Sequence, residues 1–217
     1  MKREKNLTLN QELTNLSNDT LIRKKMNALD RFEAKFGSTN DTLLERSKLL
    51  VALEEFSSAK TILIDLIKSY KSPEVILLLS KCFSASDNIE ETSKFKNILE
   101  ENIKYFENNP AYWTLLALYA RNCKDYQTAL GACIFTLEKF DENIPQIWKI
   151  LAFSSFKLQD YEKVYEVCKT HLRKSELNSY LVEAYLNSCV NTGNYDEAVK
   201  FIDTTPFKWR ENPIILG

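Results

Sequence analysis

Histidine and cysteine side chains most often carry catalysis or bind metals, and the chain has a single histidine among its 217 residues. His171 has no nucleophile at a spacing that suggests a catalytic pair. It falls late in a predicted helix, where the helix dipole mildly favours a cation, so we interpret it as a surface side chain. The sequence also lacks a glycine-rich phosphate-binding loop. We therefore expect no catalytic residue and no enzyme activity.

The cysteines could in principle form disulfides or hold zinc. They number five and form no CxxC pair. An odd count with wide spacing argues against a disulfide framework and against a zinc site. We expect no metal and no cofactor. A reducing compartment, the cytoplasm or the nucleus, would suit such a chain.

One short motif recurs and could be mistaken for a reactive site. The stretches KDYQTALGAC, QDYEKVYEVC and GNYDEAVKFI begin at Lys124, Gln159 and Gly193. Each contains a tyrosine followed three positions later by a small or apolar residue. Two further copies carry Phe56 and Ile89 where these three have Tyr126, Tyr161 and Tyr195. The spacings between the five successive residues are 33, 37, 35 and 34. A constant period of this length indicates a structural repeat, and it makes Cys133 and Cys168 equivalent core positions.

Prolines follow the same period and mark a second helix in each unit. Pro110 opens a stretch whose apolar residues recur at helical spacing from Trp113 to Ala120. Pro73 and Pro145 open equivalent stretches, and proline suits the first turn of a helix. The tyrosine motif then starts the other helix of the pair, because residues such as Asp125 are good N-caps.

A pair of helices of this size cannot bury its apolar face alone, so the units must stack. We predict an all-α fold, an α-solenoid of tandem antiparallel helix pairs. The predicted organisation is a disordered segment over 1–18, a capping helix over 19–39, five repeats over 40–72, 73–109, 110–144, 145–178 and 179–212, and the start of a sixth repeat over 213–217. Because Pro213 lies 68 residues after Pro145, we hypothesise that the chain is part of a longer array or is completed by a partner helix.

The layout resembles the tetratricopeptide repeat. That family places an aromatic residue ahead of a leucine–small pair in the first helix and Tyr-x-x-Ala in the second. The unit over 110–144 matches at five positions: Trp113, Leu116, Ala117, Tyr126 and Ala129. The next unit has Val164 in place of alanine, the last has Val182 in place of the aromatic residue, and the first two units are degenerate, with Arg46 where leucine is expected. The resemblance covers residues 40–212 and implies a right-handed superhelix.

The resemblance further implies that partners bind in a concave groove lined by the first helix of each pair. Carried over position by position, the predicted groove residues are Leu77, Lys81, Thr114, Leu118, Arg121, Asn122, Gln146, Lys149, Phe153, Phe156, Lys157, Tyr180, Asn187 and Asn191. Their cations and aromatic rings predict a protein or peptide partner with acidic and apolar side chains. The carboxylate clamp for heat-shock-protein tails is missing, since leucines such as Leu78 and Leu115 hold its positions.

Charge and hydropathy narrow the function further. The net charge of −1 gives no excess that would attract nucleic acid or an anionic membrane surface. The longest apolar run, Val75 to Leu79, is too short to span a bilayer. We expect a non-enzymatic scaffold or adaptor within a multi-subunit complex. The alternatives are an RNA-processing scaffold of the half-tetratricopeptide type and a regulatory or interaction domain of a larger protein.

Overall fold

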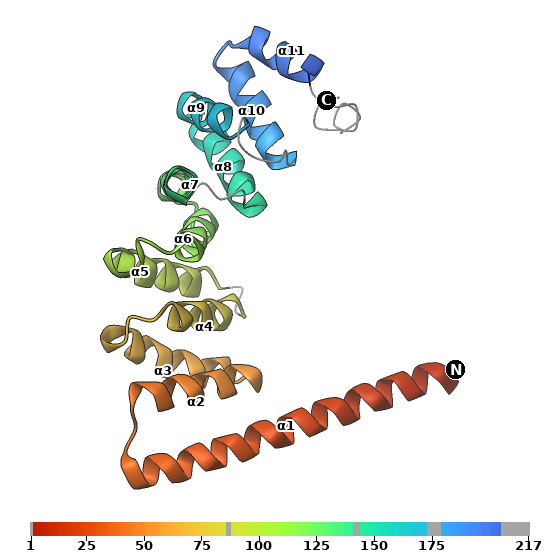
Figure 1. Cartoon of the computed structure of the whole chain (residues 1–217), viewed down its shortest axis with the longest axis vertical. Helices are drawn as coiled ribbons and strands as arrows, with labels where there is room; N and C mark the ends of the chain where they lie inside the picture. Colours follow the sequence, from red (N-terminus) through yellow and green to blue (C-terminus); the bar gives the residue numbers. More distant parts are fainter. Residues whose placement is uncertain (1, 86–87, 141–143, 173–178, 205–217) are drawn as a thin grey trace. The chain divides into compact units, whose positions relative to one another are not determined.

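The computed structural model describes residues 2–85, 88–140, 144–172 and 179–204, with side chains described from residue 19 onwards. Figure 1 shows that this part of the chain is built from α-helices in sequential order. It contains eleven helices and no strand within the described ranges: α1 Lys2–Phe36, α2 Asn40–Ala52, α3 Phe56–Ser69, α4 Pro73–Ser84, α5 Ile89–Phe106, α6 Pro110–Asn122, α7 Tyr126–Phe140, α8 Pro145–Leu158, α9 Tyr161–Leu172, α10 Ser179–Asn191 and α11 Tyr195–Thr204. The predicted all-α fold of tandem antiparallel helix pairs is confirmed.

The chain divides into two compact units. The first comprises Met1–Glu91 and the second comprises Thr92–Gly217. In the first unit α1 packs on α2, and α2 packs on α3 and α4. In the second unit each helix from α6 to α11 packs on the next, and α8 also contacts both α6 and α10. Neighbouring first helices of the pairs therefore lie side by side within the second unit.

The helix bounds agree with the sequence period. The first helices of the pairs begin at Asn40, Pro73, Pro110, Pro145 and Ser179, and the second helices begin at Phe56, Ile89, Tyr126, Tyr161 and Tyr195. On that basis we propose the division into five units. The predicted sixth unit at 213–217 lies outside the described residues.

Side-chain caps explain why the helices begin where they do. Asn109 lies before Pro110, and its Oδ1 accepts a hydrogen bond from the amide of Tyr112 at 3.2 Å. Asp125 caps α7 in the same way, since its Oδ1 accepts from the amide of Thr128 at 3.1 Å. These bonds satisfy amides that the helix itself leaves without a partner. Asp125 is thus a capping residue, as the sequence predicted.

The turns between paired helices use a left-handed backbone. Lys124 and Gln159 have φ values of 63° and 56°, and Gly193 has a φ of 75° at the equivalent turn. A residue in this conformation reverses the chain directly after a helix, and glycine adopts it without a steric penalty. The same short turn therefore recurs between α6 and α7, α8 and α9, and α10 and α11.

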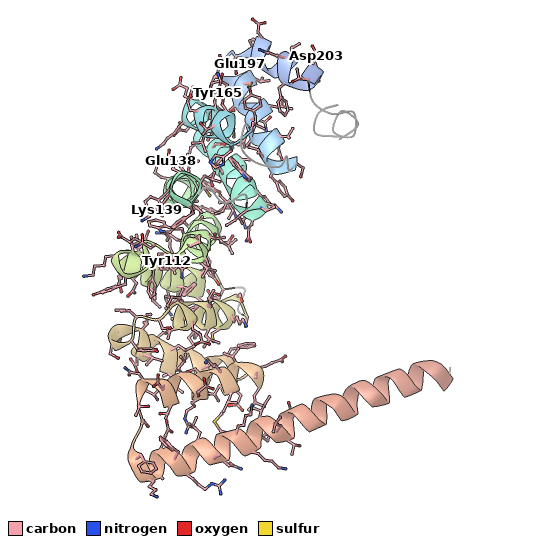
Figure 2. The ribbon with its side chains drawn as sticks, viewed as in Figure 1. Tyr112, Glu138, Lys139, Tyr165, Glu197 and Asp203 are labelled. Atoms are coloured by element: carbon pink, nitrogen blue, oxygen red, sulfur yellow. The ribbon has the colours of Figure 1, made fainter. Side chains whose placement is uncertain are left out.

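The core of the second unit is made of the residues that repeat. Cys133 and Cys168 are fully buried, as predicted for equivalent repeat positions. Tyr112, labelled in Figure 2, is also buried, and its hydroxyl donates to the carbonyl of Leu99 in α5. Its ring stacks on Phe106 with centroids 5.2 Å apart. The conspicuous aromatic residue of α6 thus joins it to the preceding helix.

His171 is a correction to the sequence analysis. The side chain is 3% exposed, and its ring meets Trp148 edge to face at 5.3 Å. The prediction of a surface histidine is wrong, because His171 follows the buried Cys168 by three residues and so shares its face of α9. Its position in the core provides no evidence for a catalytic role.

Helix α1 also differs from the expectation. The sequence analysis predicted disorder over 1–18 and a separate capping helix from residue 19, whereas α1 is one helix over Lys2–Phe36. Residues 2–36 contain neither proline nor glycine, so nothing in the local sequence interrupts a helix. Arg46 of α2 binds this helix, with ion pairs to Asp30 at 2.6 Å and to Glu33. The departure from the repeat pattern at Arg46 therefore fixes α1 on α2.

A series of ion pairs joins second helices of successive pairs. In each, a lysine of one helix reaches an acidic residue at the start of the next: Lys60 with Glu91, Lys96 with Asp125 at 2.9 Å, and Lys169 with Glu197 at 2.7 Å. An acidic residue in the first turn also interacts favourably with the helix dipole. These lysines therefore contribute to stacking.

No described helix is both long enough and apolar enough to traverse a lipid bilayer.

Candidate functional site

A hollow of about 440 Å³ lies across α6, α8 and α10, and we call it the α8–α10 hollow. Seven of the predicted groove residues line it: Arg121, Lys149, Phe153, Phe156, Lys157, Tyr180 and Asn187. They come from three different helices and from positions spread over 67 residues, from 121 to 187. Residues chosen by their place in the repeat thus meet at one surface of the second unit.

Helical periodicity explains how α8 supplies most of this surface. Lys149, Phe153 and Phe156 are spaced four and three residues apart and share one face of the helix. Trp148 and Leu151, on the other face, are fully buried. Because α8 contacts both α6 and α10, its outward face lies between the corresponding faces of those helices.

The hollow exposes large apolar side chains. Phe153 is 44% exposed and Phe156 is 59% exposed. The Phe153 ring packs edge to face against the ring of Tyr126 in α7, with the ring centroids 5.8 Å apart. Because the two phenylalanines are three residues apart, their exposed rings lie on the same face of α8.

Lysines lie against these rings. The Lys157 ammonium is 5.5 Å from the centroid of Phe153 and 5.8 Å from that of Phe156. Lys149 of α8 lies 5.6 Å from the ring of Tyr180 on α10. Such contacts hold a cation near an aromatic face without neutralising its charge. The cations of the hollow are therefore available to an acidic group.

The charge of the hollow is positive. Arg121, Lys149 and Lys157 line it together with one carboxylate, Glu183, which leaves a formal excess of two positive charges. In the described part of the chain, these three cations form no ion pair. Arg121 donates from Nη2 to Oδ1 of Asn122 at 3.0 Å, a bond that uses one of its five N–H donors. The hollow is thus positive in a nearly neutral chain.

The other predicted groove residues do not line this hollow. Thr114 is half-buried and donates to the carbonyl of Pro110 at 2.9 Å, and Asn191 donates to the carbonyl of Asn187 at 2.7 Å. The remaining ones in the second unit are Leu118, Asn122 and Gln146, of which Leu118 is half-buried and the other two are exposed. Leu77 and Lys81 are exposed on α4 of the first unit.

Two lining residues were missed by the sequence analysis, Ala152 and Glu183. Glu183 is the fifth residue of α10, just as Lys149 is the fifth residue of α8. The same positional rule that selected Lys149 would therefore have found Glu183. Ala152 stands at the eighth position of α8, which the rule does not include.

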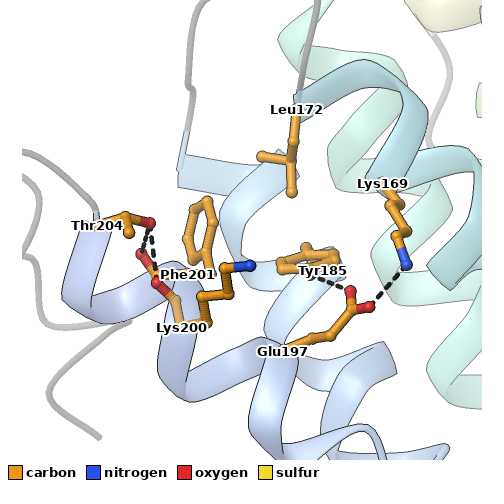
Figure 3. Close-up of a pocket in the computed structure, with 7 residues that line it drawn as sticks. All are labelled: Lys169, Leu172, Tyr185, Glu197, Lys200, Phe201 and Thr204. Atoms are coloured by element: carbon orange, nitrogen blue, oxygen red, sulfur yellow. Dashed lines mark hydrogen bonds and ion pairs between the residues drawn. The ribbon is translucent and has the colours of Figure 1, made fainter.

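A second hollow, of about 290 Å³, lies where α9, α10 and α11 meet. Figure 3 shows its lining residues, with Tyr185 beside the ion pair of Lys169 and Glu197 and with Phe201 on the other side of Tyr185. Glu197 accepts hydrogen bonds from Lys169 at 2.7 Å and from Tyr185 at 3.2 Å. The bond from Lys169, with smaller contributions from neighbouring tyrosines, lowers the pKa of Glu197 to about 2. Glu197 is therefore ionised at neutral pH and acts as an ion-pair partner rather than as a general acid.

The buried thiols have no features of nucleophiles or metal ligands. Burial raises the pKa of both Cys133 and Cys168, so each is a neutral thiol at pH 7. Within the described residues, no group of three or more histidine, cysteine or acidic side chains is placed to hold a metal ion.

Comparisons with known proteins bear on the fold. No protein-family model matches the chain, and no curated protein matches it. One chain of the solved structure of Naa15/Naa10 bound to HypK-THB superposes with a TM-score of 0.61 at 15% sequence identity, over 92% of this chain and 31% of that chain. This chain thus spans less than a third of the length of that neighbour. At this identity the likeness concerns the fold alone, and together with the eleven described helices it identifies the chain as a helical-repeat fold.

Proposed function

We propose that this chain is a non-enzymatic scaffold whose α8–α10 hollow binds a segment of a partner protein, within a multi-subunit complex. The observation that carries the proposal is the convergence of seven groove residues, predicted from repeat position, on one hollow with exposed aromatic rings and with cations that form no ion pair among the described residues. The solved neighbour, described as Naa15/Naa10 bound to HypK-THB, is consistent with a fold that takes part in complexes. A location in the cytoplasm or nucleus stays a prediction.

The geometry favours a particular kind of segment. The phenylalanines at 153 and 156 suit apolar side chains, while Arg121, Lys149 and Lys157 suit carboxylates. Asn187 at the rim is exposed and can donate to and accept from a peptide backbone. A segment with acidic and apolar side chains a turn apart, held by its side chains in the groove, meets both requirements.

A matched pair of double variants tests the proposal. Lys149→Glu with Phe153→Ala removes one cation and one exposed ring from the hollow. Lys104→Glu with Tyr105→Ala is the control, because this exposed lysine lies 4.9 Å from a tyrosine ring on α5, away from the hollow. Both variants reverse the charge of one exposed lysine and remove one exposed aromatic ring, so a loss specific to the first identifies the hollow.

The measurement is quantitative mass spectrometry of proteins that co-purify with each variant and with the unmodified chain. We expect a defined set of partners to be lost with the hollow variant and kept with the control. Thermal unfolding midpoints should be unchanged in both, since all four side chains are exposed. If the hollow variant retains every partner that the unmodified chain captures, the hollow is not the binding surface and the proposal is wrong.

A further inference from the structure

Three exposed side chains of α8 form a row in which an aromatic ring lies between two cations. Lys149, Phe153 and Lys157 follow one another at intervals of four residues. Residues four apart in a helix share nearly the same face and lie about 6 Å apart along the axis. The two lysines therefore lie about 12 Å apart along α8, with the ring of Phe153 midway between them. We call these three residues the α8 row.

Aromatic contacts hold both ammonium groups of the row in the α8–α10 hollow. The Lys149 ammonium lies 5.6 Å from the ring centroid of Tyr180 in α10, and the Lys157 ammonium lies 5.5 Å from that of Phe153. A ring attracts a cation but does not neutralise its charge. Neither lysine forms an ion pair among the described residues. Each end of the row therefore offers a positive charge to a carboxylate at a defined place.

The α10 side of the hollow carries the opposite charge. Glu183 is the fifth residue of α10, as Lys149 is of α8, and it lines the same hollow. The residue is half-buried and forms no ion pair within the described part of the chain. Because like charges repel, Glu183 disfavours acidic groups on the α10 side and directs them toward the α8 row.

The lining of the hollow suits a helical ligand better than an extended one. An extended peptide presents backbone N–H groups that each need an acceptor. Among the side chains that line the hollow, acceptors are confined to the Tyr180 hydroxyl, the Glu183 carboxylate and the Asn187 amide. A helix satisfies its backbone groups internally except at its ends, so it needs only side-chain contacts from the hollow.

We propose that the α8–α10 hollow binds an amphipathic helix of a partner protein that carries an acidic residue, an apolar residue four positions later and a second acidic residue four positions after that. This helix has the same spacing as the α8 row. Lying along α8, it pairs its carboxylates with Lys149 and Lys157 and places its apolar side chain on Phe153. The inference rests on the proposed function, to which it adds the conformation and the charge spacing of the partner segment.

The chain itself contains this spacing at one place, residues 203–211. Pro206 lies inside that stretch, and proline disrupts the interior of a helix because it lacks an N–H and its ring clashes with the preceding turn. Lys208 and Arg210 lie there too, and their cations would meet a hollow that is already positive. A partner helix without these features complements the hollow better than this stretch does.

A pair of designed peptides tests the spacing. The first is a fluorescently labelled, alanine-rich helix of about 20 residues with glutamate, leucine and glutamate at intervals of four and glutamines on its other face. In the second, the later glutamate is exchanged with the glutamine two positions before it, which moves one carboxylate to the other face at constant composition. Each is titrated with the full chain, and binding is followed by fluorescence anisotropy. We expect saturable binding of the first peptide and at least about threefold weaker binding of the second, which loses one charged contact.

Charge reversal separates recognition from folding. Lys149→Glu with Lys157→Glu should reject the first peptide and bind a peptide with lysines in place of both glutamates, since a gain of binding does not arise from unfolding. Lys104→Glu with Lys163→Glu is the matched control, because it makes the same change of charge at exposed lysines that do not line the hollow. Glu183→Gln should strengthen binding of the first peptide by about twofold, because it removes a repulsive carboxylate.

Several outcomes would overturn the proposal. Three concern the peptides: no saturable binding of the first, equal binding of the first and second, or an unchanged preference in the charge-reversed chain. Two concern other occupants: about tenfold tighter peptide binding by Phe207→Ala would assign the hollow to the chain's own segment, and a dimer in light scattering that Phe153→Ala dissociates would assign it to a second copy. If any of these is found while the hollow variant still loses co-purifying partners, the inference is wrong and the proposed function stands.

Discussion

Two substitutions at the same repeat position should have very different costs. Leu130 in α7 and Val199 in α11 are both fifth residues of second helices, but they are 2% and 58% exposed. Leu130→Ala removes three carbon atoms from a closely packed site and leaves a cavity, which costs about 3 kcal/mol of unfolding free energy. Val199→Ala removes atoms that are mostly in solvent, and alanine is the better helix former, so its effect should stay within about 0.5 kcal/mol.

Urea denaturation followed by circular dichroism measures both costs against the unmodified chain. Because repeat proteins can unfold in steps, the near-ultraviolet signal should give the same midpoint as the helical signal before free energies are compared. The slope of free energy against urea should be equal for the three proteins. A loss of unfolding free energy for Val199→Ala as large as that for Leu130→Ala would show that Val199 is covered in the folded chain. It would refute the argument that the two equivalent positions differ in burial.

Three further predictions concern other parts of the structure. Arg46→Leu removes the ion pairs of α2 with two carboxylates of α1, so hydrogen exchange should become faster in α1 while α3 and α4 stay unchanged. Glu197 should titrate near pH 2 in carboxyl-carbon NMR, because its pKa is lowered from an ordinary 4.5 to about 2. The stabilisation that results from this shift is complete above pH 4.5 and is lost as the pH falls toward 2. Lys169→Met should raise the pKa of Glu197. Thiol labelling of the native chain should modify half-buried Cys123 first and reach the four buried cysteines only after unfolding.

The sequence period predicted the helices well because local signals agree with it. Pro73, Pro110 and Pro145 each begin a first helix, and proline at such a position pre-sets the first turn. Asp125 caps the following second helix through its own side chain. Both signals act within a few residues along the chain, so they can be read without knowledge of the tertiary structure.

Contacts between distant elements were harder to predict. Arg46 breaks the repeat pattern. Its role in holding α1 becomes clear only from its contacts with Asp30 and Glu33, which lie 16 and 13 residues earlier in the sequence. His171 was assigned to the surface from its place near a helix end, although its spacing from Cys168 already placed it on the buried face. In both cases the deciding factor is the neighbouring helix, which one helix's composition does not reveal.

The residues of the candidate site could be predicted only in part, again because contacts with neighbouring groups are not visible in the sequence. Repeat position indicates which residues point away from the core, and three of the residues chosen in this way, Lys149, Phe153 and Tyr180, line one hollow. It does not indicate whether an outward polar side chain bonds its own helix. Thr114 and Asn191 do so, and they are therefore less available to a partner than their positions suggest.

The two sets of cations in the second unit differ in a way that bears on function. On the second helices, Lys96 and Lys169 reach acidic residues at the start of the next second helix and so stabilise the stack. On the first helices, Lys149 and Lys157 lie against aromatic rings and form no ion pair among the described residues. If charge on this chain served stacking alone, acidic partners would be expected on both sides. Because the cations on the first helices form no ion pair among the described residues, they support our proposal that a ligand with carboxylates binds at the α8–α10 hollow.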